Sequence, residues 1–263
     1  SLSFTNNDLT IKKPRYNLQG QMLYKISDQW SSQTVISRGN VKSDGYYTYI
    51  WDDGVRDNYF DQYFHNEQQT TNTTDIQQNF NGDFKIGSVR NRILIGLDYY
   101  SRNVIDNGSG WAAIRKISPQ ESEIKVDLDL EPIDEPIYLS KALVDNVLAG
   151  QTGSRTNKKN SISSAYISNV LNFTPSLSVM ASLRLDYFDS KGDLKDPEDD
   201  YDQLALSPKF GVVYQPVLDK VSIFANYMNA FINVNPREVF DENNVSQGVK
   251  SFKPEQANQW EVG

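Results

Sequence analysis

Long runs of residues that alternate one by one between apolar and polar constrain the fold of this chain most. In the run 178–190, for example, Leu183 and Leu185 alternate with Arg184 and Asp186. A period of two places successive side chains on opposite faces of a β-strand, whereas an amphipathic helix repeats its apolar residues every three or four positions. The runs extend for about 12 to 15 residues, which exceeds the usual five or six of soluble strands and suits the tilted wall of a transmembrane barrel.

The runs predict eight long strands and the start of a ninth near residue 256, joined by connections that alternate between short and long. The strands are expected at 14–26, 30–44, 72–86, 90–104, 160–173, 178–190, 204–216 and 220–233. Short connections fall at 27–29, 87–89, 174–176 and 216–219, and long ones near 45–71, 105–159, 191–203 and 234–255. Short turns on one rim and long loops on the other are typical of outer-membrane barrels, whereas a soluble domain has no reason to keep a long loop at every second connection.

We therefore predict an all-β fold, an antiparallel transmembrane β-barrel segment of about eight long strands with short periplasmic turns and long extracellular loops. The apolar face of the wall should meet lipid through Ile93, Ile95, Leu97, Val179, Leu183, Leu185, Val221 and Ile223. The opposite face should point to the lumen with Arg92, Asp98, Arg184 and Asp186. Within 105–159, either a helix or an apolar patch that packs the loop onto itself would explain the spacing of Leu139, Leu143, Val144, Val147 and Leu148 after Pro136.

Composition excludes several classes of protein. A formal net charge of −8 and a pI near 4.8 disfavour nucleic acid as a partner, because no excess of Lys and Arg is present to neutralise phosphates. The mean hydropathy of −0.58 and the absence of an apolar run of about 20 residues exclude a helical membrane protein. The chain has no cysteine, so disulfides and thiolate metal sites are also excluded. The 12% of aromatic residues fits the aromatic girdles of a barrel.

Three stretches of the chain are similar to TonB-dependent siderophore receptors of the ferrichrome-type group. The first is QQNFNGDF at 77–84, which continues through the short turn 87–89 to LIGLDY at 94–99. The second is LSPKFGVVYQP at 206–216 with FANYMNAF at 224–231, which resembles the family's S-P-[RK]-x-G-x-x-Y-x-P and Y-A-x-Y-x-x-x-F. The third is FKPEQ at 252–256 followed by QWEVG at 259–263, similar to the family's L-K-P-E-x-x-x-x-Y-E-V-G.

The resemblance implies an outer-membrane receptor that imports a ferric siderophore, with the siderophore, the lipid bilayer and TonB as partners. Members of the family are barrels of about 22 strands around a plug through which TonB acts. The sequence shows neither a plug nor a TonB-contacting segment, so residues 1–263 are expected to be a partial barrel domain that lacks the plug and the C-terminal strands. No cofactor is expected, since the iron would arrive inside its chelate.

Two alternatives remain open from the residues alone. One is a different outer-membrane barrel, such as a porin or a carbohydrate or cobalamin receptor. The other, from a separate class, is a soluble or surface β-protein that binds partners through aromatic loops.

No catalytic residues and no metal ligands are predicted, and the chain is not expected to be an enzyme. His65 is the only histidine and has no nucleophile motif beside it, so it is interpreted as a loop surface residue or a ligand contact. The acidic run 196–200 lacks the spacing of a calcium loop and is interpreted as a solvated loop. The same interpretation applies to the acidic residues Asp127, Asp129, Glu131, Asp134 and Glu135.

The segment between Tyr46 and His65 is the candidate binding site. It contains eight aromatic residues, Tyr46, Tyr47, Tyr49, Trp51, Tyr59, Phe60, Tyr63 and Phe64. In the barrel interpretation this segment belongs to a long connection and faces the exterior. Aromatic rings there would offer a large, partly apolar iron chelate flat contact area and hydroxyl groups for hydrogen bonds. An interfacial girdle or packing between loops is the alternative explanation.

Overall fold

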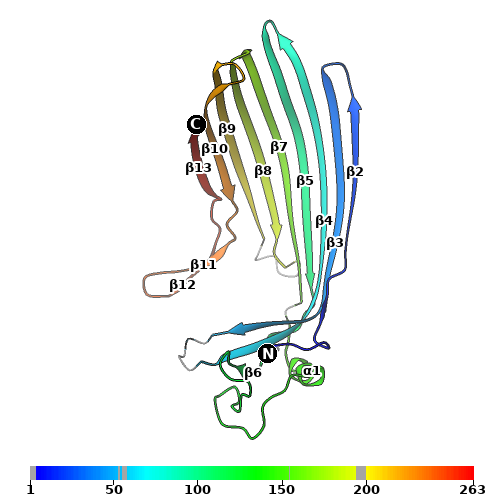
Figure 1. Ribbon diagram of the computed structural model, residues 1–263, viewed down its shortest axis with the longest axis vertical. Helices are drawn as coiled ribbons and strands as arrows, with labels where there is room; N and C mark the ends of the chain where they lie inside the picture. Colours follow the sequence, from blue (N-terminus) through cyan, green and yellow to red (C-terminus); the bar gives the residue numbers. More distant parts are fainter. Residues whose placement is uncertain (1–3, 53, 55–57, 154, 194–199) are drawn as a thin grey trace. The chain divides into compact units, whose positions relative to one another are not determined.

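The chain folds into long antiparallel strands and one short helix (Figure 1). This computed structural model describes residues 4–52, 54, 58–153, 155–193 and 200–263. The strands are β1 (Ile11–Lys12), β2 (Arg15–Lys25), β3 (Trp30–Trp51), β4 (Phe60–Ile86), β5 (Val89–Asp106), β6 (Ala112–Ile117), β7 (Thr156–Thr174), β8 (Leu177–Lys191), β9 (Tyr201–Val217), β10 (Val221–Ile232), β11 (Arg237–Phe240), β12 (Ser246–Lys250) and β13 (Glu255–Val262). The helix α1 spans Lys141–Ala149. Of the acidic run 196–200, only Asp200 lies within the described residues.

Most strands belong to one sheet, in the order β1-β3-β4-β5-β7-β8-β9-β10-β13. β2 also pairs with β3, β6 also pairs with β4, and β11 and β12 form a separate two-stranded sheet. The pairing is antiparallel, as between β8 and β9, where Leu183 lies opposite Pro208 and Leu185 opposite Leu206. The order of the strands therefore follows the order of the chain, which is the topology of a meander and needs no crossover connection.

The predicted strands and the alternation of their connections are confirmed, with one correction. The short connections are 26–29, 87–88, 175–176 and 218–220, and the longer ones are 52–59, 107–155, 192–200 and 233–254. The predicted long loop at 45–71 is wrong in extent, because β3 continues to Trp51 and β4 already begins at Phe60. Aromatic residues occupy both faces of these strand ends, so the apolar–polar alternation that marks a strand disappears there.

The helical spacing after Pro136 indeed belongs to a helix. Ser140 is the N-cap of α1, and its hydroxyl oxygen accepts a hydrogen bond from the Leu143 backbone N–H at 3.1 Å. Val144 and Leu148 are the buried residues of this helix. In the described part of the chain, no helix is long and apolar enough to cross a membrane.

The chain divides into two compact units. Unit 1 contains residues 1–16, 40–72 and 104–157, and unit 2 contains residues 17–39, 73–103 and 158–263. The hydrophobic core of unit 1 consists of Leu9, Phe64, Ala112, Ile114, Val144 and Leu148. These residues come from β4, β6, α1 and the segment before β1, so the long connection between β5 and β7 folds onto the strand ends rather than remaining irregular.

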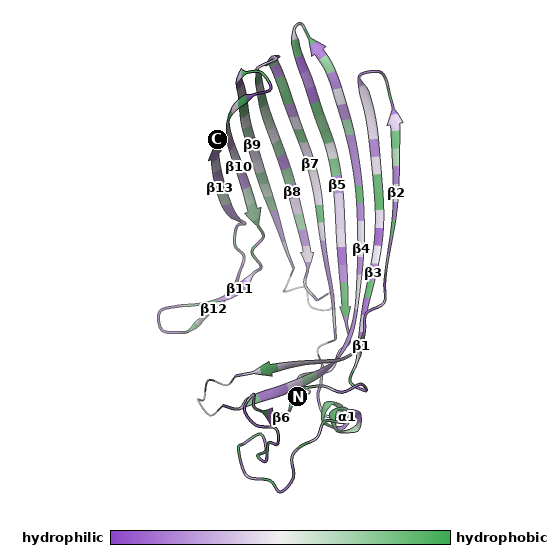
Figure 2. Ribbon diagram, in the orientation of Figure 1, coloured by the Kyte–Doolittle hydropathy of each residue, from purple (hydrophilic) through white to green (hydrophobic). Residues whose placement is uncertain are grey.

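Unit 2 is a wall with one apolar and one polar face, and apolar and polar residues alternate along its strands in Figure 2. Leu97, Leu183 and Ile223 are large apolar side chains that remain 42–59% exposed. On the other face, Arg184 contacts Asp98 and Asp186, so these three of the predicted lumen residues share one side of the sheet. A soluble sheet would bury its apolar face, and the exposed apolar side chains therefore need a nonaqueous neighbour.

Candidate functional site

Six rings gather on unit 1 where the ends of β3 and β4 lie side by side. They are Tyr47, Tyr49, Trp51, Tyr63, His65 and Trp111, and we call them the aromatic cluster. Tyr49 lies in the middle of the cluster. It stacks on Tyr63 with ring centroids 5.4 Å apart and an interplanar angle of 14°, and it meets the edge of Trp111 at 4.8 Å. These centroid separations lie in the range that favours aromatic pairs.

His65 and Trp111 form the second stack of the cluster. Their ring centroids are 4.0 Å apart and the interplanar angle is 24°. Tyr47 meets both rings edge-on at 6.0 Å, and Trp51 meets Tyr49 edge-on at 6.4 Å. The rings therefore form one connected network rather than separate pairs.

The alternation of side chains along a strand explains which aromatic residues join the cluster. The odd-numbered residues 47, 49 and 51 of β3 share one face, and the odd-numbered residues 63 and 65 of β4 meet them. Even-numbered neighbours point the other way. Phe64 is only 1% exposed and lies in the core of unit 1, and the Tyr46 hydroxyl donates a hydrogen bond to Asp145 of α1.

The structure thus separates the eight predicted site residues into two groups. Tyr47, Tyr49, Trp51 and Tyr63 lie in the aromatic cluster. The other four lie outside it: Tyr46, Tyr59, Phe60 and Phe64. Among these four, Phe60 pairs with Ile117 of β6, and the Tyr59 hydroxyl donates to a Glu121 carboxylate oxygen at 3.2 Å.

The sequence did not predict Trp111 as a residue of the candidate site, and it did not predict that His65 packs with the other rings of the aromatic cluster. Trp111 comes from the connection that follows β5, and it reaches the cluster because β6 pairs with β4, with Ala112 opposite Phe64. No local pattern in the sequence predicts this contact. The place of His65 in the cluster could have been predicted, since His65 follows Tyr63 by two positions and so lies on the same face of β4.

The electrostatics of the cluster favour neutral rings. Burial lowers the pKa of His65 below its ordinary value, against smaller opposing effects of Glu67, Asp106 and the backbone of Ser109. The imidazole is therefore uncharged at neutral pH and stacks as a flat ring on Trp111. Tyr47, Trp51 and Trp111 keep 41–54% of their surface exposed, so the cluster presents open aromatic area to a ligand.

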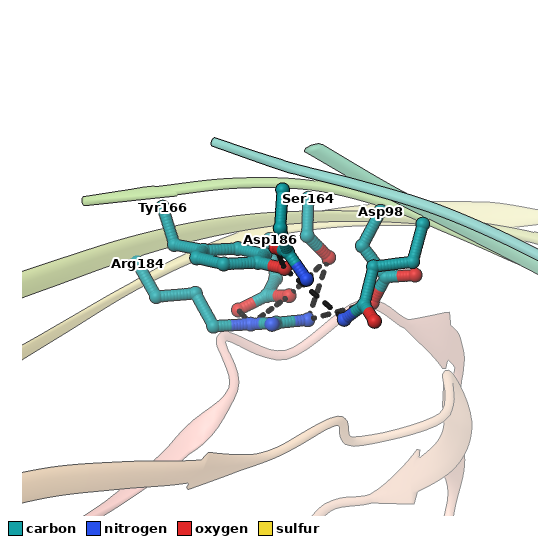
Figure 3. Close-up of polar contacts among 7 residues, drawn as sticks. Asp98, Ser164, Tyr166, Arg184 and Asp186 are labelled. Atoms are coloured by element: carbon teal, nitrogen blue, oxygen red, sulfur yellow. Dashed lines mark hydrogen bonds and ion pairs between the residues drawn. The ribbon is translucent and has the colours of Figure 1, made fainter. Parts of the chain in front are cut away.

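The face of unit 2 that is predicted to point to the lumen carries a group of polar residues (Figure 3). The Arg184 guanidinium donates from Nε to Asp186 Oδ1 at 2.8 Å and from Nη2 to Ser164 Oγ at 2.8 Å, and Asp98 lies at 3.4 Å. The Tyr166 ring covers this guanidinium at 5.2 Å. Asp186 is almost fully buried, and its charge is compensated within the group, so we interpret the group as a structural network of the wall.

The chemistry available to the aromatic cluster is noncovalent binding. Stacked rings and phenol hydroxyls can hold a flat, partly apolar ligand. Within the described ranges, no three His, Asp or Glu side chains converge on a point where they would hold a metal ion.

Comparisons with known proteins agree with the fold. A family model described as TonB dependent receptor-like, beta-barrel, matches residues 2–263. The ferric preacinetobactin receptor BauA of Acinetobacter baumannii is 15% identical, with a TM-score of 0.68 over 96% of this chain and 34% of that chain. The ferric-catecholate import receptor Fiu of E. coli K12 is 15% identical, with a TM-score of 0.68 over 99% of this chain and 39% of that chain.

The siderophore receptor PiuA of Acinetobacter baumannii is 14% identical, with a TM-score of 0.67 over 96% of this chain and 37% of that chain. The chain therefore spans 34–39% of the length of these three structures. At such low identity the likeness shows the fold alone. None of the curated protein sequences compared with the chain matches it.

Proposed function

The chain belongs to the TonB-dependent receptor β-barrel family, and from this premise we propose that it forms part of a bacterial outer-membrane receptor that imports a ferric siderophore. The family and the similar solved structures are transport receptors rather than enzymes. Membership in the family removes the porin and the soluble β-protein from the alternatives and leaves receptors for other cargo, such as carbohydrate or cobalamin. We include in the proposal that residues 1–263 are a partial barrel domain and that TonB acts through a plug domain outside them.

The observation that carries the proposal is the aromatic cluster. It lies at the ends of β3 and β4, with Trp111 from the connection after β5, on the long-loop side of the strand pattern, which in an outer-membrane barrel faces the exterior. A ferric siderophore is a large, partly apolar chelate whose own oxygen atoms hold the iron. Such a ligand needs flat contact area and hydrogen-bond donors from the protein rather than metal ligands, and Tyr49, Tyr63 and Trp111 supply both.

The arrangement of the rings supports capture of the chelate on a prepared surface. Tyr49 is held between Tyr63 and Trp111, so its ring loses little further freedom when a ligand stacks on the cluster. Two of the four tryptophans of the chain, Trp51 and Trp111, lie in the cluster and provide an intrinsic signal for binding.

The test is a binding titration of the full-length protein in detergent, in which quenching of tryptophan fluorescence reports binding. The titrants are a ferric catecholate, a ferric hydroxamate, cobalamin and a maltodextrin. We expect one ferric chelate to bind and Trp111→Ala to weaken its binding about tenfold or more, as expected for the loss of a central aromatic contact. Trp260→Ala is the matched control, because Trp260 lies on β13 in unit 2 and its ring contacts Tyr227 rather than a ring of the cluster.

Two outcomes would contradict the proposal. One is saturable binding of cobalamin or maltodextrin with no binding of either ferric chelate. The other is equal chelate affinity of wild type, Trp111→Ala and Trp260→Ala, which would show that the cluster takes no part in binding.

A further inference from the structure

Unit 1 contains a cavity of about 250 Å³ between β6 and the connection that follows this strand. Most of the residues that line the cavity are apolar, among them Phe4, Ile117, Ile124, Val126 and Ile137. At about 30 Å³ for each molecule of liquid water, the volume equals about eight waters, which is room for one small organic molecule. A mostly apolar lining with a few well-placed polar groups is the usual form of a small-molecule site.

The Arg115 side chain, from β6, is held in the wall of this cavity by hydrogen bonds. Its Nε donates to Gln62 Oε1 at 2.9 Å, and its Nη1 donates to the Ile137 carbonyl oxygen at 3.1 Å. Gln62 is fully buried, and its amide nitrogen donates to the Phe4 carbonyl oxygen and to Thr48 Oγ1. The guanidinium is therefore fixed in place before a ligand arrives, which lowers the entropic cost of binding.

The charge of Arg115 has no counterion in the part of the chain that the structure describes. No ion pair there includes Arg115, and its described hydrogen bonds leave Nη2 unused. Burial lowers the pKa of Arg115 with no carboxylate to offset the effect, yet a guanidinium stays charged at neutral pH. A half-buried cation without a counterion is costly, and an anion bound at Nη2 removes part of that cost.

The other charged residues of the lining already have partners. Lys116 forms an ion pair with Asp61 at 3.0 Å. Glu121 is exposed, and one of its carboxylate oxygens accepts a hydrogen bond from the Tyr59 hydroxyl at 3.2 Å. Arg115 is therefore the cation of the cavity that can receive an anion, and the nearby Glu121 carboxylate disfavours a ligand with more than one negative charge.

The cavity and the aromatic cluster belong to opposite faces of β4. Gln62 alternates along the strand with Tyr63 of the cluster, and Arg115 lies opposite Gln62 in the pairing of β6 with β4. None of the six rings of the cluster lines the cavity. The cavity is thus separate from the proposed chelate surface.

We propose that this cavity binds a small monocarboxylate with an apolar body, such as a benzoate or a short-chain fatty acid. The carboxylate accepts a charge-assisted hydrogen bond from Arg115 Nη2, and the apolar body lies against Ile117, Ile124 and Val126. The ligand is a free acid from the surroundings, because the cavity has no room for a large molecule. This inference does not depend on the proposed transport of a ferric chelate.

The experiment titrates para-fluorobenzoate against the full-length protein in detergent micelles, and the width of the fluorine NMR line reports binding. Micelles without protein give the background from partition of the acid. Arg115→Met removes the charge, and Arg155→Met is its matched control, because Arg155 is an exposed arginine of unit 1 outside the cavity lining. Ile124→Trp fills the cavity without altering Arg115, and its control is Leu128→Trp, on the same connection but outside the lining.

We expect saturable binding of para-fluorobenzoate by the wild type. Arg115→Met should weaken this binding at least about tenfold, as expected for the loss of a hydrogen bond to a charged group, and Arg115→Lys should preserve part of the affinity. Ile124→Trp should also weaken binding at least about tenfold, whereas both control variants should bind as the wild type does. The acid should raise the midpoint of thermal unfolding of the wild type by mass action. Should Arg115→Met fail to fold, Ile124→Trp and its control decide the question.

Four outcomes would overturn the inference. The first is no binding to the wild type beyond the background of empty micelles, and the second is equal affinity of the cavity variants and their controls. The third is equally tight binding of para-fluorobenzamide, which would mean that the charge of the acid is not recognised. The fourth is displacement of the acid by inorganic phosphate at the same concentration, which would indicate a general anion site. Binding of a ferric chelate should leave the affinity for the acid unchanged, and competition between them would instead assign the cavity to the chelate site.

Discussion

The ring of Tyr166 on β7 fills the space in front of Gly96 on β5, so closely that a β-carbon at Gly96 would overlap the ring. This contact places Tyr166 so that its ring covers the Arg184 guanidinium and its hydroxyl donates to Asn79 at 2.6 Å. A glycine in the middle of a strand normally weakens the strand. At Gly96 the lack of a side chain allows the Tyr166 ring to approach the backbone closely. The polar network on the predicted lumen face therefore requires a residue without a side chain at position 96.

Gly96→Ala should destabilise the fold by about 1–3 kcal/mol, the usual cost of overpacking, because the added methyl group displaces the Tyr166 ring. Gly20→Ala is the matched control, since a β-carbon at Gly20 meets no atom within 4 Å. Urea unfolding of both variants in lipid vesicles measures the difference. Equal stability of the two variants would mean that Tyr166 moves aside at no cost.

Arg184→Ser should destabilise the wall by about 1–3 kcal/mol, because among the described residues it leaves the buried Asp186 carboxylate with only the Ser164 hydroxyl as a side-chain partner. The side chain of Arg184 is itself 39% exposed, and solvent screening keeps the effect below that of a fully buried pair. Arg102→Ser is the control, since Arg102 is exposed. The free energies of unfolding of both variants decide the question, and a loss no greater than that of the control would contradict the network.

Leu183→Arg should cost roughly 2–4 kcal/mol of stability in a bilayer, the range for a cation on the lipid face of a barrel near the midplane. Leu183 is exposed on the face opposite to Arg184, and only lipid would make that face unfavourable for charge. The measurement compares unfolding in vesicles of Leu183→Arg and Leu183→Ile. A tolerated arginine would contradict the assignment of this face to lipid.

How much the sequence could predict depended on whether a feature was local. The apolar spacing of the helix α1 was visible in the sequence because its residues lie within ten positions of each other, although the spacing alone left a packing patch open as the alternative. The alternation in β8 was also visible in the sequence, since Arg184 and Asp186 alternate with the apolar residues Leu183, Leu185 and Tyr187. In both cases neighbouring residues carry the whole signal.

The extent of β3 and β4 and the full composition of the candidate site were not predictable in the same way. Between Tyr46 and Phe64 one face of the strands packs into a core and the other carries stacked rings, so both faces are aromatic and the period of two is lost. Trp111 joins the cluster through the pairing of β6 with β4, a contact between distant segments that one sequence does not reveal. The missing part of the site is therefore the part made by tertiary structure.

Acidification should loosen the aromatic cluster through His65. Burial lowers the pKa of His65 in the folded protein below its ordinary value of 6.5, so the unfolded chain binds the proton more tightly. The stability that the neutral imidazole contributes is present above about pH 6.5 and is lost as the pH falls through the lower pKa of the folded state. We expect the fluorescence of Trp111 to report this loss, because the two rings are stacked.

His65→Phe keeps a flat ring and removes the titration. The variant should show a smaller decrease in stability between pH 7.5 and pH 5.5 than the wild type, measured by thermal unfolding monitored through tryptophan fluorescence. The same pH dependence in both proteins would assign the effect to carboxylates elsewhere.

The last prediction concerns single alanine substitutions in the proposed chelate site. Tyr49→Ala, Trp51→Ala and Tyr63→Ala each remove a ring of the aromatic cluster, and at least one should weaken binding of the ferric chelate about tenfold or more. Tyr49 is expected to have the largest effect, because it contacts Trp51, Tyr63 and Trp111 at once. Chelate affinity is measured by fluorescence quenching.

Tyr46→Ala is the comparison that separates binding from folding. Tyr46 lies next in sequence to the cluster but packs against α1, where its hydroxyl donates to Asp145 and the Lys141 ammonium lies 5.4 Å from its ring centroid. Its removal should lower the stability of unit 1 and leave chelate affinity nearly unchanged. If all three cluster variants bind the chelate normally while Tyr46→Ala does not, the cluster is a packing element and the binding surface lies on the opposite face of the strands.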